Sequence, residues 1–264
     1  MLSRIRLVLV LLAAVALVVL LLPFQIMGLL GVTPLARHVP VVFHRCLAWL
    51  FGVCVRVEGK AETQRPLMLI SNHVSWLDIV VLSTIAPVSF VAKAEMKNWP
   101  VFGQLAQLQR TIFIKRESRR TVGHQANDIA SRLKQDDVII LFPEGTTSDG
   151  HGLYPFKTPL FEAARFALVE GEMESAAVQP VALDYQRLHG MPIGRQWRQH
   201  VAWPGEIGLI ESIVPIIKSG GLDVTVHFMP PILLTAESNR KVVAEQARAA
   251  IRSALAGRTL DSHT

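Results

Sequence analysis

The sequence predicts an α/β fold: a mixed sheet flanked by helices, preceded by an N-terminal membrane-embedded helical segment. From about Lys60 onward, short apolar runs alternate with polar, helix-compatible stretches, a pattern typical of strands and helices in turn. Before that position, residues 7–32 contain no charged side chain. A chain of 264 residues has room for one such domain with an appendage. We therefore divide it into an anchor with an interfacial helix, residues 1–59, and a second domain, residues 60–264.

The apolar run comes first in the chain. Crossing the core of a bilayer takes about 20 apolar residues, and this run is long enough. Arg4 and Arg6 precede it as they would in a signal peptide, but the apolar core of a signal peptide has only about 7–15 residues. No small-x-small cleavage site follows the run. We expect a retained anchor, and Pro23 leaves open a re-entrant or monolayer-embedded helix hairpin.

Residues 37–59 continue the apolar character but include Arg37, Arg45 and Arg56. Basic side chains can reach lipid headgroups while aromatic rings lie at the boundary, so this segment predicts an interfacial helix. The alternative is a core helix of the following domain. The chain has two cysteines, Cys46 and Cys54, which both lie here without a CxxC or Cys/His cluster. They indicate packing residues in a reducing, cytoplasmic setting.

Beyond residue 60 the elements follow from the apolar runs. Strands are expected at residues 67–71, 88–93, 111–114, 138–142, 178–183 and 222–228. Helices are expected at residues 74–84, 119–135, 157–169 and 238–256. Pro180 falls inside a strand, which indicates an edge position or a bulge.

The charge balance bears on partners. The chain has 27 Lys and Arg against 21 Asp and Glu, a net charge of +6. Such a modest basic excess suits an anionic membrane face. No basic stripe with interleaved aromatic residues is present, so the sequence does not predict binding to nucleic acid.

Polar residues gather where the predicted strands end. Asn72 and His73 follow the first strand of the domain, and Asp78 comes five positions after His73. Ligands bind at the carboxyl ends of strands in α/β folds. A folded-back carboxylate would hold the imidazole in one tautomer and support it as it takes a proton. Arg116 and the pair Glu144 and Gly145 end two further strands, so these residues are expected on one rim.

Four stretches in this order resemble the lysophospholipid and glycerol-phosphate acyltransferase family, which includes 1-acylglycerol-3-phosphate acyltransferase. The resemblance covers about residues 65–230. The family's NHx4D motif is matched by Asn72, His73 and Asp78. The second motif, GxIFIxR, is matched by Ile112, Phe113, Ile114 and Arg116. The third, FPEGTR(S), is matched by residues 142–146 and Ser148. The fourth, a short apolar strand with a proline, is matched by Val178, Pro180 and Val181.

The resemblance implies O-acyl transfer from acyl-CoA or acyl-carrier protein to the free hydroxyl of a lysolipid, with residues 60–264 as the acyltransferase domain. It implies that His73 is the catalytic base and that Asp78 orients it. The resemblance assigns acceptor binding to Arg116, Glu144, Gly145 and Thr146. It assigns the fourth motif, with Pro180 and Val181, to binding of the acyl donor. No metal and no cofactor beyond the co-substrate are implied. The chain has no GxSxG nucleophile elbow, so direct attack by the acceptor is expected.

Two positions depart from the family's motifs, and the second departure concerns the acceptor, because it removes one cation from a phosphate site. Arg110 and Thr111 stand where the second motif usually opens with glycine, and Thr147 stands where an arginine commonly follows the third motif's threonine. We place 1-acyl-sn-glycerol-3-phosphate first, giving phosphatidic acid in phospholipid biosynthesis, because it is the commonest acceptor of the family. The alternative is lyso-ornithine lipid, because "TTSDG" followed by "YPFKTPLF" resembles bacterial relatives that acylate it. The expected location is the membrane, with the catalytic domain on the cytoplasmic face of a bacterial inner membrane.

Other classes of function remain open at this point. A metal hydrolase would use His73 and Asp78 as ligands and would need at least a third, for which His151 and Asp149 are the candidates. A non-catalytic, membrane-associated lipid-binding protein is the other alternative. Release of free CoA from a thioester would distinguish an acyltransferase from this binding protein.

Overall fold

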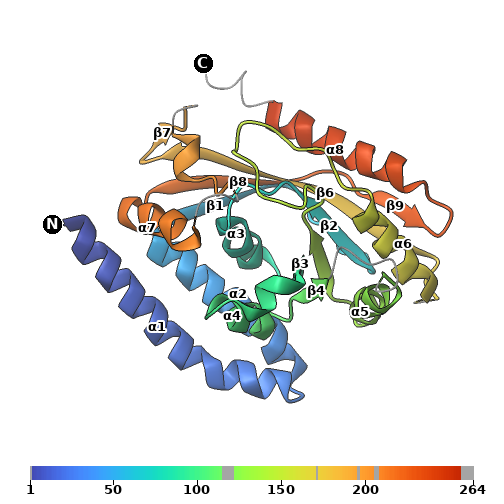
Figure 1. The fold of residues 1–264 in the computed structure, drawn as a ribbon, viewed down its shortest axis with the longest axis horizontal. Coiled ribbons are helices and arrows are strands. Elements are labelled where there is room, and N and C mark those ends of the chain that lie inside the picture. The colour runs from blue at the N-terminus through green and yellow to red at the C-terminus, as the bar shows by residue number, and fades with distance from the viewer. Residues whose placement is uncertain (1, 115–121, 171, 195–196, 205–207, 257–264) are drawn as a thin grey trace.

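A mixed sheet lies at the centre of the computed structural model, which describes residues 2–114, 122–170, 172–194, 197–204 and 208–256 (Figure 1). Its strand order is β1-β8-β6-β2-β5-β3-β4. The strands are β1 (Val53–Gly59), β2 (Leu67–Ser71), β3 (Val88–Lys93), β4 (Ile112–Ile114), β5 (Val138–Leu141), β6 (Ser175–Leu188) and β8 (Leu222–Phe228), with the short β7 (Met191–Pro192) and β9 (Ile232–Thr235) paired to β6. Strands β2 to β6 run parallel, and β8 is antiparallel to β6. The predicted mixed α/β sheet is confirmed.

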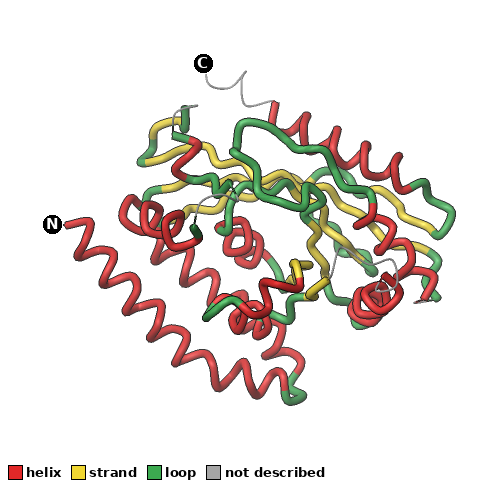
Figure 2. Tube along the Cα trace, viewed as in Figure 1, coloured by secondary structure: helices red, strands yellow, loops and turns green. Residues whose placement is uncertain are grey.

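Helices cover both faces of the sheet, as the tube in Figure 2 shows. One face carries α1 (Leu2–Leu29), α2 (Thr33–Phe51), α3 (Leu77–Ile85) and α7 (Leu209–Ser219), with the short α4 (Phe102–Leu108) beside them. The other face carries α5 (Val122–Lys134), α6 (Pro159–Glu170) and α8 (Arg240–Ala256). Each face of the sheet has its own hydrophobic core. Leu67 and Leu69 of β2 belong to the core beneath α2, α3 and α7, and Met68 and Ile70 belong to the core beneath α5, α6 and α8. A parallel strand buried on both faces reads as a continuous apolar run, which is why β2 was visible in the sequence.

The ends of β2, β3 and β8 agree with the sequence prediction to the residue. Strand β1 was not predicted: the segment expected to be one interfacial helix is the helix α2 followed by β1, which pairs in parallel with β8. The boundary placed between residues 59 and 60 therefore separates this strand from the sheet to which it belongs. Helices α4 and α7 and strands β7 and β9 were also missed.

Pro180 lies in the centre of the sheet, so of the two positions predicted for it, an edge or a bulge, the edge is wrong. The register shift of β6 against β8 lies between Tyr185 and Arg187, away from the proline. The neighbours of Pro180 explain how a residue without an N–H fits at this central position. On one side Pro180 pairs with Ile70 of β2. On the other side β9 pairs with β6 only as far as Val178, and β8 begins to pair only at Val181. The proline occupies the gap between these two partners, where no N–H is required of it, while its carbonyl accepts the Met229 N–H at 3.1 Å.

Helix α1 is attached to the rest of the molecule near both of its ends. The Arg6 guanidinium donates to the carbonyls of Ile217 and Phe51, at 2.7 and 3.2 Å, and so satisfies the last turns of α7 and α2. Near the other end, the Gln25 amide donates to the Leu108 carbonyl at 2.5 Å. The helix continues through Pro23 without a break. Between these contacts α1 lies along α2 (Figure 1).

Three arginines converge on Asp137, which precedes β5. Arg37 of α2, Arg110 and Arg132 of α5 lie 3.2, 2.7 and 3.1 Å from its carboxylate. Arg110 adopts φ 62°, the left-handed conformation that favours glycine. The family's usual glycine thus reflects a real demand of the backbone. This chain meets it with an arginine whose side chain joins the ion cluster.

We expect Asp137→Ala to lower the free energy of unfolding by roughly 3 kcal/mol, because the arginines would then face one another without their carboxylate. Arg110→Gly should cost much less, since glycine recovers about 1 kcal/mol of left-handed strain while two arginines still neutralise Asp137. Thermal unfolding in detergent measures both. Equal destabilisation by the two substitutions would contradict this account of the cluster.

Candidate active site

His73 and Asp78 form a hydrogen-bonded pair at the carboxyl end of β2. The turn of residues 72–76 joins β2 to α3, and Asp78 lies in the first turn of that helix. Its Oδ2 is 2.7 Å from the His73 Nδ1. The same oxygen accepts the backbone N–H of Val74 at 2.7 Å and of Ser75 at 3.0 Å. The pairing assigns the Nδ1 proton to the bond with Asp78 and leaves Nε2 with the lone pair that can accept a proton.

Asp78 is fully buried, and its other oxygen also has a donor. The Tyr185 hydroxyl, from β6, donates to Oδ1 at 2.5 Å. Burial and the negative charge of Asp78 raise the pKa of Tyr185 well above its ordinary value, so the phenol keeps the proton that it donates. Tyr185 was not among the residues expected at the site. No pattern around it in the sequence points to this contact, which joins residues 107 positions apart.

Two further side chains hold the turn and the imidazole. The Asn72 amide donates to the Leu183 carbonyl at 3.0 Å, and its oxygen accepts the Leu183 N–H at 2.8 Å. Phe142 stacks on the His73 ring with 4.0 Å between centroids and 15° between planes. Phe90 stacks in turn on Phe142 at 6.0 Å. These contacts fix the plane of the imidazole, whose side chain is 18% exposed.

Glu144, from the third motif, reaches the first motif through its carboxylate. Its Oε1 accepts the backbone N–H of His73 at 2.7 Å, and its Oε2 accepts that of Tyr154 at 2.8 Å. Burial raises the pKa of Glu144 to about 7, against the lowering effect of these two N–H groups. Gly145 follows with φ 73°, where an L side chain would be strained, and Thr146 is exposed. The structure therefore brings the first and third motifs together, as predicted for one rim.

Other predicted residues lie elsewhere. Arg116 falls outside the described residues. Pro180 and Val181 are interior to β6, where Val181 pairs with Ser71 directly before the first motif. Thr147 is buried, and its hydroxyl donates to the Trp203 carbonyl. An arginine at position 147 would have no room without a rearrangement of that loop. The change from the family's arginine to threonine is therefore not a simple exchange of one exposed side chain for another.

The metal-hydrolase alternative needs a third ligand beside His73 and Asp78. Over the described ranges, no group of three or more His, Cys, Asp or Glu residues is arranged to hold a metal ion. The Asp149 Oδ1 accepts the backbone N–H of its neighbour His151 at 2.9 Å. Nothing in this arrangement supports the hydrolase alternative.

Comparison with known proteins adds to this geometry. A family model described as "Acyltransferase" matches residues 53–184. The chain is 47% identical to a Brucella abortus protein named lyso-ornithine lipid O-acyltransferase, covering 98% of this chain and 99% of that protein. It is 46% identical to a Rhizobium meliloti protein of the same name, over 90% of this chain and 82% of that protein. It is 33% identical to a Neisseria meningitidis 1-acyl-sn-glycerol-3-phosphate acyltransferase, over 78% of each.

A solved structure is also similar. The Thermotoga maritima 1-acyl-sn-glycerophosphate (LPA) acyltransferase, PlsC, superimposes with a TM-score of 0.65 and covers 98% of both chains. Its sequence identity to this chain is 18%, so the likeness concerns the fold. The mixed sheet flanked by helices, with a helical segment at the N-terminus, was expected from the sequence. The same fold is found in this solved acyltransferase.

The raised pKa of Glu144 has a measurable effect on stability. Because the folded protein holds this proton up to about pH 7 and an unfolded carboxyl only to about 4.5, rising pH across that window favours the unfolded chain. We expect the free energy of unfolding to fall there, and Glu144→Gln to remove a contribution of roughly 3 kcal/mol from that fall. Thermal unfolding in detergent at a series of pH values measures the slope. The exposed Glu174→Gln is the control, and identical slopes in the two variants would show that Glu144 does not titrate in this window.

Proposed function

Since the chain belongs to the acyltransferase family, as its four motifs predict, we propose that it is a lyso-ornithine lipid O-acyltransferase. Acyl transfer to a lysolipid is common to the relatives of both names. The choice of acceptor rests on one observation: the similarity to the Brucella abortus protein extends over almost the whole of both chains at 47% identity. This reverses the order given by the sequence, which placed 1-acyl-sn-glycerol-3-phosphate first.

The loop of the third motif is compatible with the same acceptor but does not by itself select it. The arginine that the family commonly carries is replaced by Thr147, which is buried and bonded to Trp203. An acceptor without a phosphate does not need that cation. The headgroup of ornithine offers a carboxylate and an amine instead.

The pair of His73 and Asp78 supports direct transfer. We propose that the His73 Nε2 removes the proton from the acceptor hydroxyl while the oxygen attacks the thioester carbonyl of acyl-CoA or acyl-carrier protein. The tetrahedral intermediate then expels the thiolate, which takes the proton from the imidazolium, so the products are the O-acylated lipid and the free thiol. Asp78, with its charge held in place by Tyr185, stabilises the imidazolium between the two steps. Acyl-CoA or acyl-carrier protein is the only co-substrate in this scheme.

We further propose that residues 1–59 hold the enzyme on the membrane, on the cytoplasmic face of a bacterial inner membrane. Helix α1 is the one helix, over the described ranges, that is long and apolar enough to cross a bilayer. However, Arg6 and Gln25 bind it to the domain near both ends, about 28 Å apart at the rise of an α-helix. A helix held in this way lies along the domain. Insertion of α1 and α2 into one leaflet fits these contacts better than a perpendicular span.

His73→Ala should lower kcat by about 10²–10⁴-fold, because a general base contributes that much to a proton transfer. Asp78→Asn should also be severely impaired, since the amide cannot balance the imidazolium charge. Release of free CoA from acyl-CoA in detergent measures both, and flotation with liposomes should show unchanged membrane binding. The exposed His189→Ala is the matched control. Turnover of His73→Ala at the level of this control would exclude the proposed base.

The acceptor is tested with purified enzyme, one acyl donor and the two lysolipids in the same detergent. We expect a higher kcat/KM for lyso-ornithine lipid than for 1-acyl-sn-glycerol-3-phosphate. Thr147→Arg should reduce activity toward both, because its site is buried, whereas Thr147→Ser keeps the hydroxyl and should be close to wild type. A gain in activity toward 1-acyl-sn-glycerol-3-phosphate in Thr147→Arg would instead show that position 147 faces the acceptor.

A further inference from the structure

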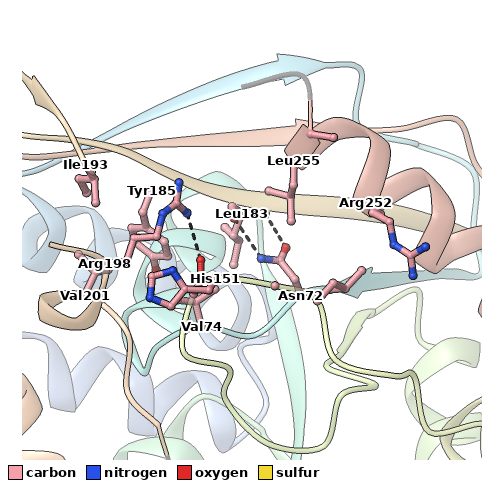
Figure 3. A pocket seen from close by; sticks show the side chains of 14 residues that line it. Asn72, Val74, His151, Leu183, Tyr185, Ile193, Arg198, Val201, Arg252 and Leu255 are labelled. Atoms are coloured by element: carbon pink, nitrogen blue, oxygen red, sulfur yellow. Dashed lines mark hydrogen bonds between the residues drawn. The ribbon is translucent and has the colours of Figure 1, made fainter. Parts of the chain in front are cut away.

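A cavity of about 230 Å³ opens beside the first motif (Figure 3). Its walls come from five parts of the chain that are far apart in sequence, one of them β6 with Leu183 and Tyr185. Asn72 and Val74 belong to the first-motif turn, residues 150–153 follow the third motif, and Arg252 and Leu255 lie near the end of α8. Arg198 and Val201 close the remaining side. None of the four acyltransferase motifs accounts for the side chains contributed by α8 and by residues 193–201.

The cavity is basic. His151, Arg198 and Arg252 line it, and no Asp or Glu is among the described residues in its wall. Figure 3 shows Arg198 beside the loop that carries His151, with Arg252 extending from α8. The Arg198 Nη1 donates to the Gly150 carbonyl at 3.1 Å. The Arg252 guanidinium is exposed, and the described part of the chain provides no hydrogen-bond or ion-pair partner for it.

The cavity is also beside the turn that carries His73, although His73 itself does not line it. Asn72 and Val74, which do line it, flank His73, and Tyr185, which lines it as well, donates to Asp78. A headgroup joined by a short linker to a hydroxyl at His73 has this cavity one residue away along the first-motif turn. The volume of the cavity is below the range of about 300–1,000 Å³ usual for drug-sized ligands. The cavity therefore suits a small lipid headgroup better than the long phosphorylated arm of the acyl donor.

We propose that this cavity binds the carboxylate of the acceptor's amino-acid headgroup, with Arg252 and Arg198 as its donors. The inference rests on the proposed function and names the headgroup site of that acceptor. A guanidinium fork matches the two oxygens of a carboxylate and binds it through charge-assisted hydrogen bonds. Leu153, Ile193 and Leu255 form apolar walls against which the methylene groups of the headgroup pack. Selection of an amino-acid headgroup then depends on residues outside the four motifs.

The test uses Arg252→Gln in the full chain, with Lys241→Gln as the matched control. Lys241 is exposed at the other end of α8, so the control removes one cation from the same helix but not from the cavity. We expect Arg252→Gln to raise the KM for lyso-ornithine lipid by about 10-fold to 100-fold, the effect of losing one hydrogen bond to a charged group. The KM for the acyl donor and the unfolding temperature should not change. Lys241→Gln should match wild type in all three.

A second acceptor identifies the group that is bound. This acceptor is an analogue of lyso-ornithine lipid whose carboxylate is replaced by a carboxamide. The KM of wild type for this analogue should be as high as the KM of Arg252→Gln for lyso-ornithine lipid, and Arg252→Gln should raise the KM for the analogue little further. If Arg252→Gln raises the KM for the analogue by the same factor as for lyso-ornithine lipid, the assignment to the carboxylate is overturned. A change confined to the KM of the donor would assign the cavity to the donor's phosphate instead, and an unchanged KM for both would show that the cavity binds neither.

These outcomes are separate from failure of the proposed function. Wild type that acylates 1-acyl-sn-glycerol-3-phosphate but not lyso-ornithine lipid would disprove the acceptor before any variant is compared. Wild type that acylates lyso-ornithine lipid, together with an unaltered KM in Arg252→Gln, would disprove only the role of the cavity.

Discussion

The buried carboxylate of Asp78 is the constraint on which the site depends. An ionised group without exposure to water is costly unless donors surround it, and here the donors are the His73 imidazole, two backbone N–H groups and the Tyr185 hydroxyl. The backbone donors come from the turn itself, so satisfying the charge also shapes the turn. The tyrosine comes from β6, so the same charge joins the turn to the sheet. Orientation of the His73 imidazole is thus a consequence of burying one charge in the first turn of α3, where the helix dipole favours it.

The sheet order brings the remaining parts of the site to this carboxylate. Strands β2 and β5 are parallel neighbours, with Met68 opposite Ile139, so the turns after them emerge side by side. Glu144 uses that proximity and accepts the backbone N–H of His73. The ordinary solvation of a carboxylate is lost at this buried position, which is why its pKa is raised despite two hydrogen bonds. Through this hydrogen bond the third motif holds the backbone of the first.

Sequence reasoning succeeded where burial leaves a continuous apolar run, as in β2, β3 and β8. It missed β1, in which Val53, Val55 and Val57 alternate with Cys54, Arg56 and Glu58 as in a half-buried strand, because the apolar helix before it was extended through this segment. It missed α7, in which Pro215 lies inside the helix. At the site, the motifs identified His73, Asp78 and Glu144, but the contact of Tyr185 with Asp78 depends on strand pairing that no local pattern encodes. Nor does a motif reveal which side chains point inward, and for that reason the burial of Thr147 became evident only in the structure.

The contact between the membrane-proximal helices and the site follows from the packing of α2 on α3. Phe51, the last residue of α2, meets Trp76 edge to face at 5.8 Å, and Trp76 directly precedes the helix that carries Asp78. Farther along, the Arg45 Nε donates to the Thr84 carbonyl near the end of α3 at 2.7 Å. Two contacts along the length of α3 leave it little freedom to move relative to α2. If α1 and α2 insert into a leaflet, the height of His73 above the lipid is therefore set by this packing. In the transfer proposed above, the acceptor hydroxyl then has to move to an imidazole whose position is already determined.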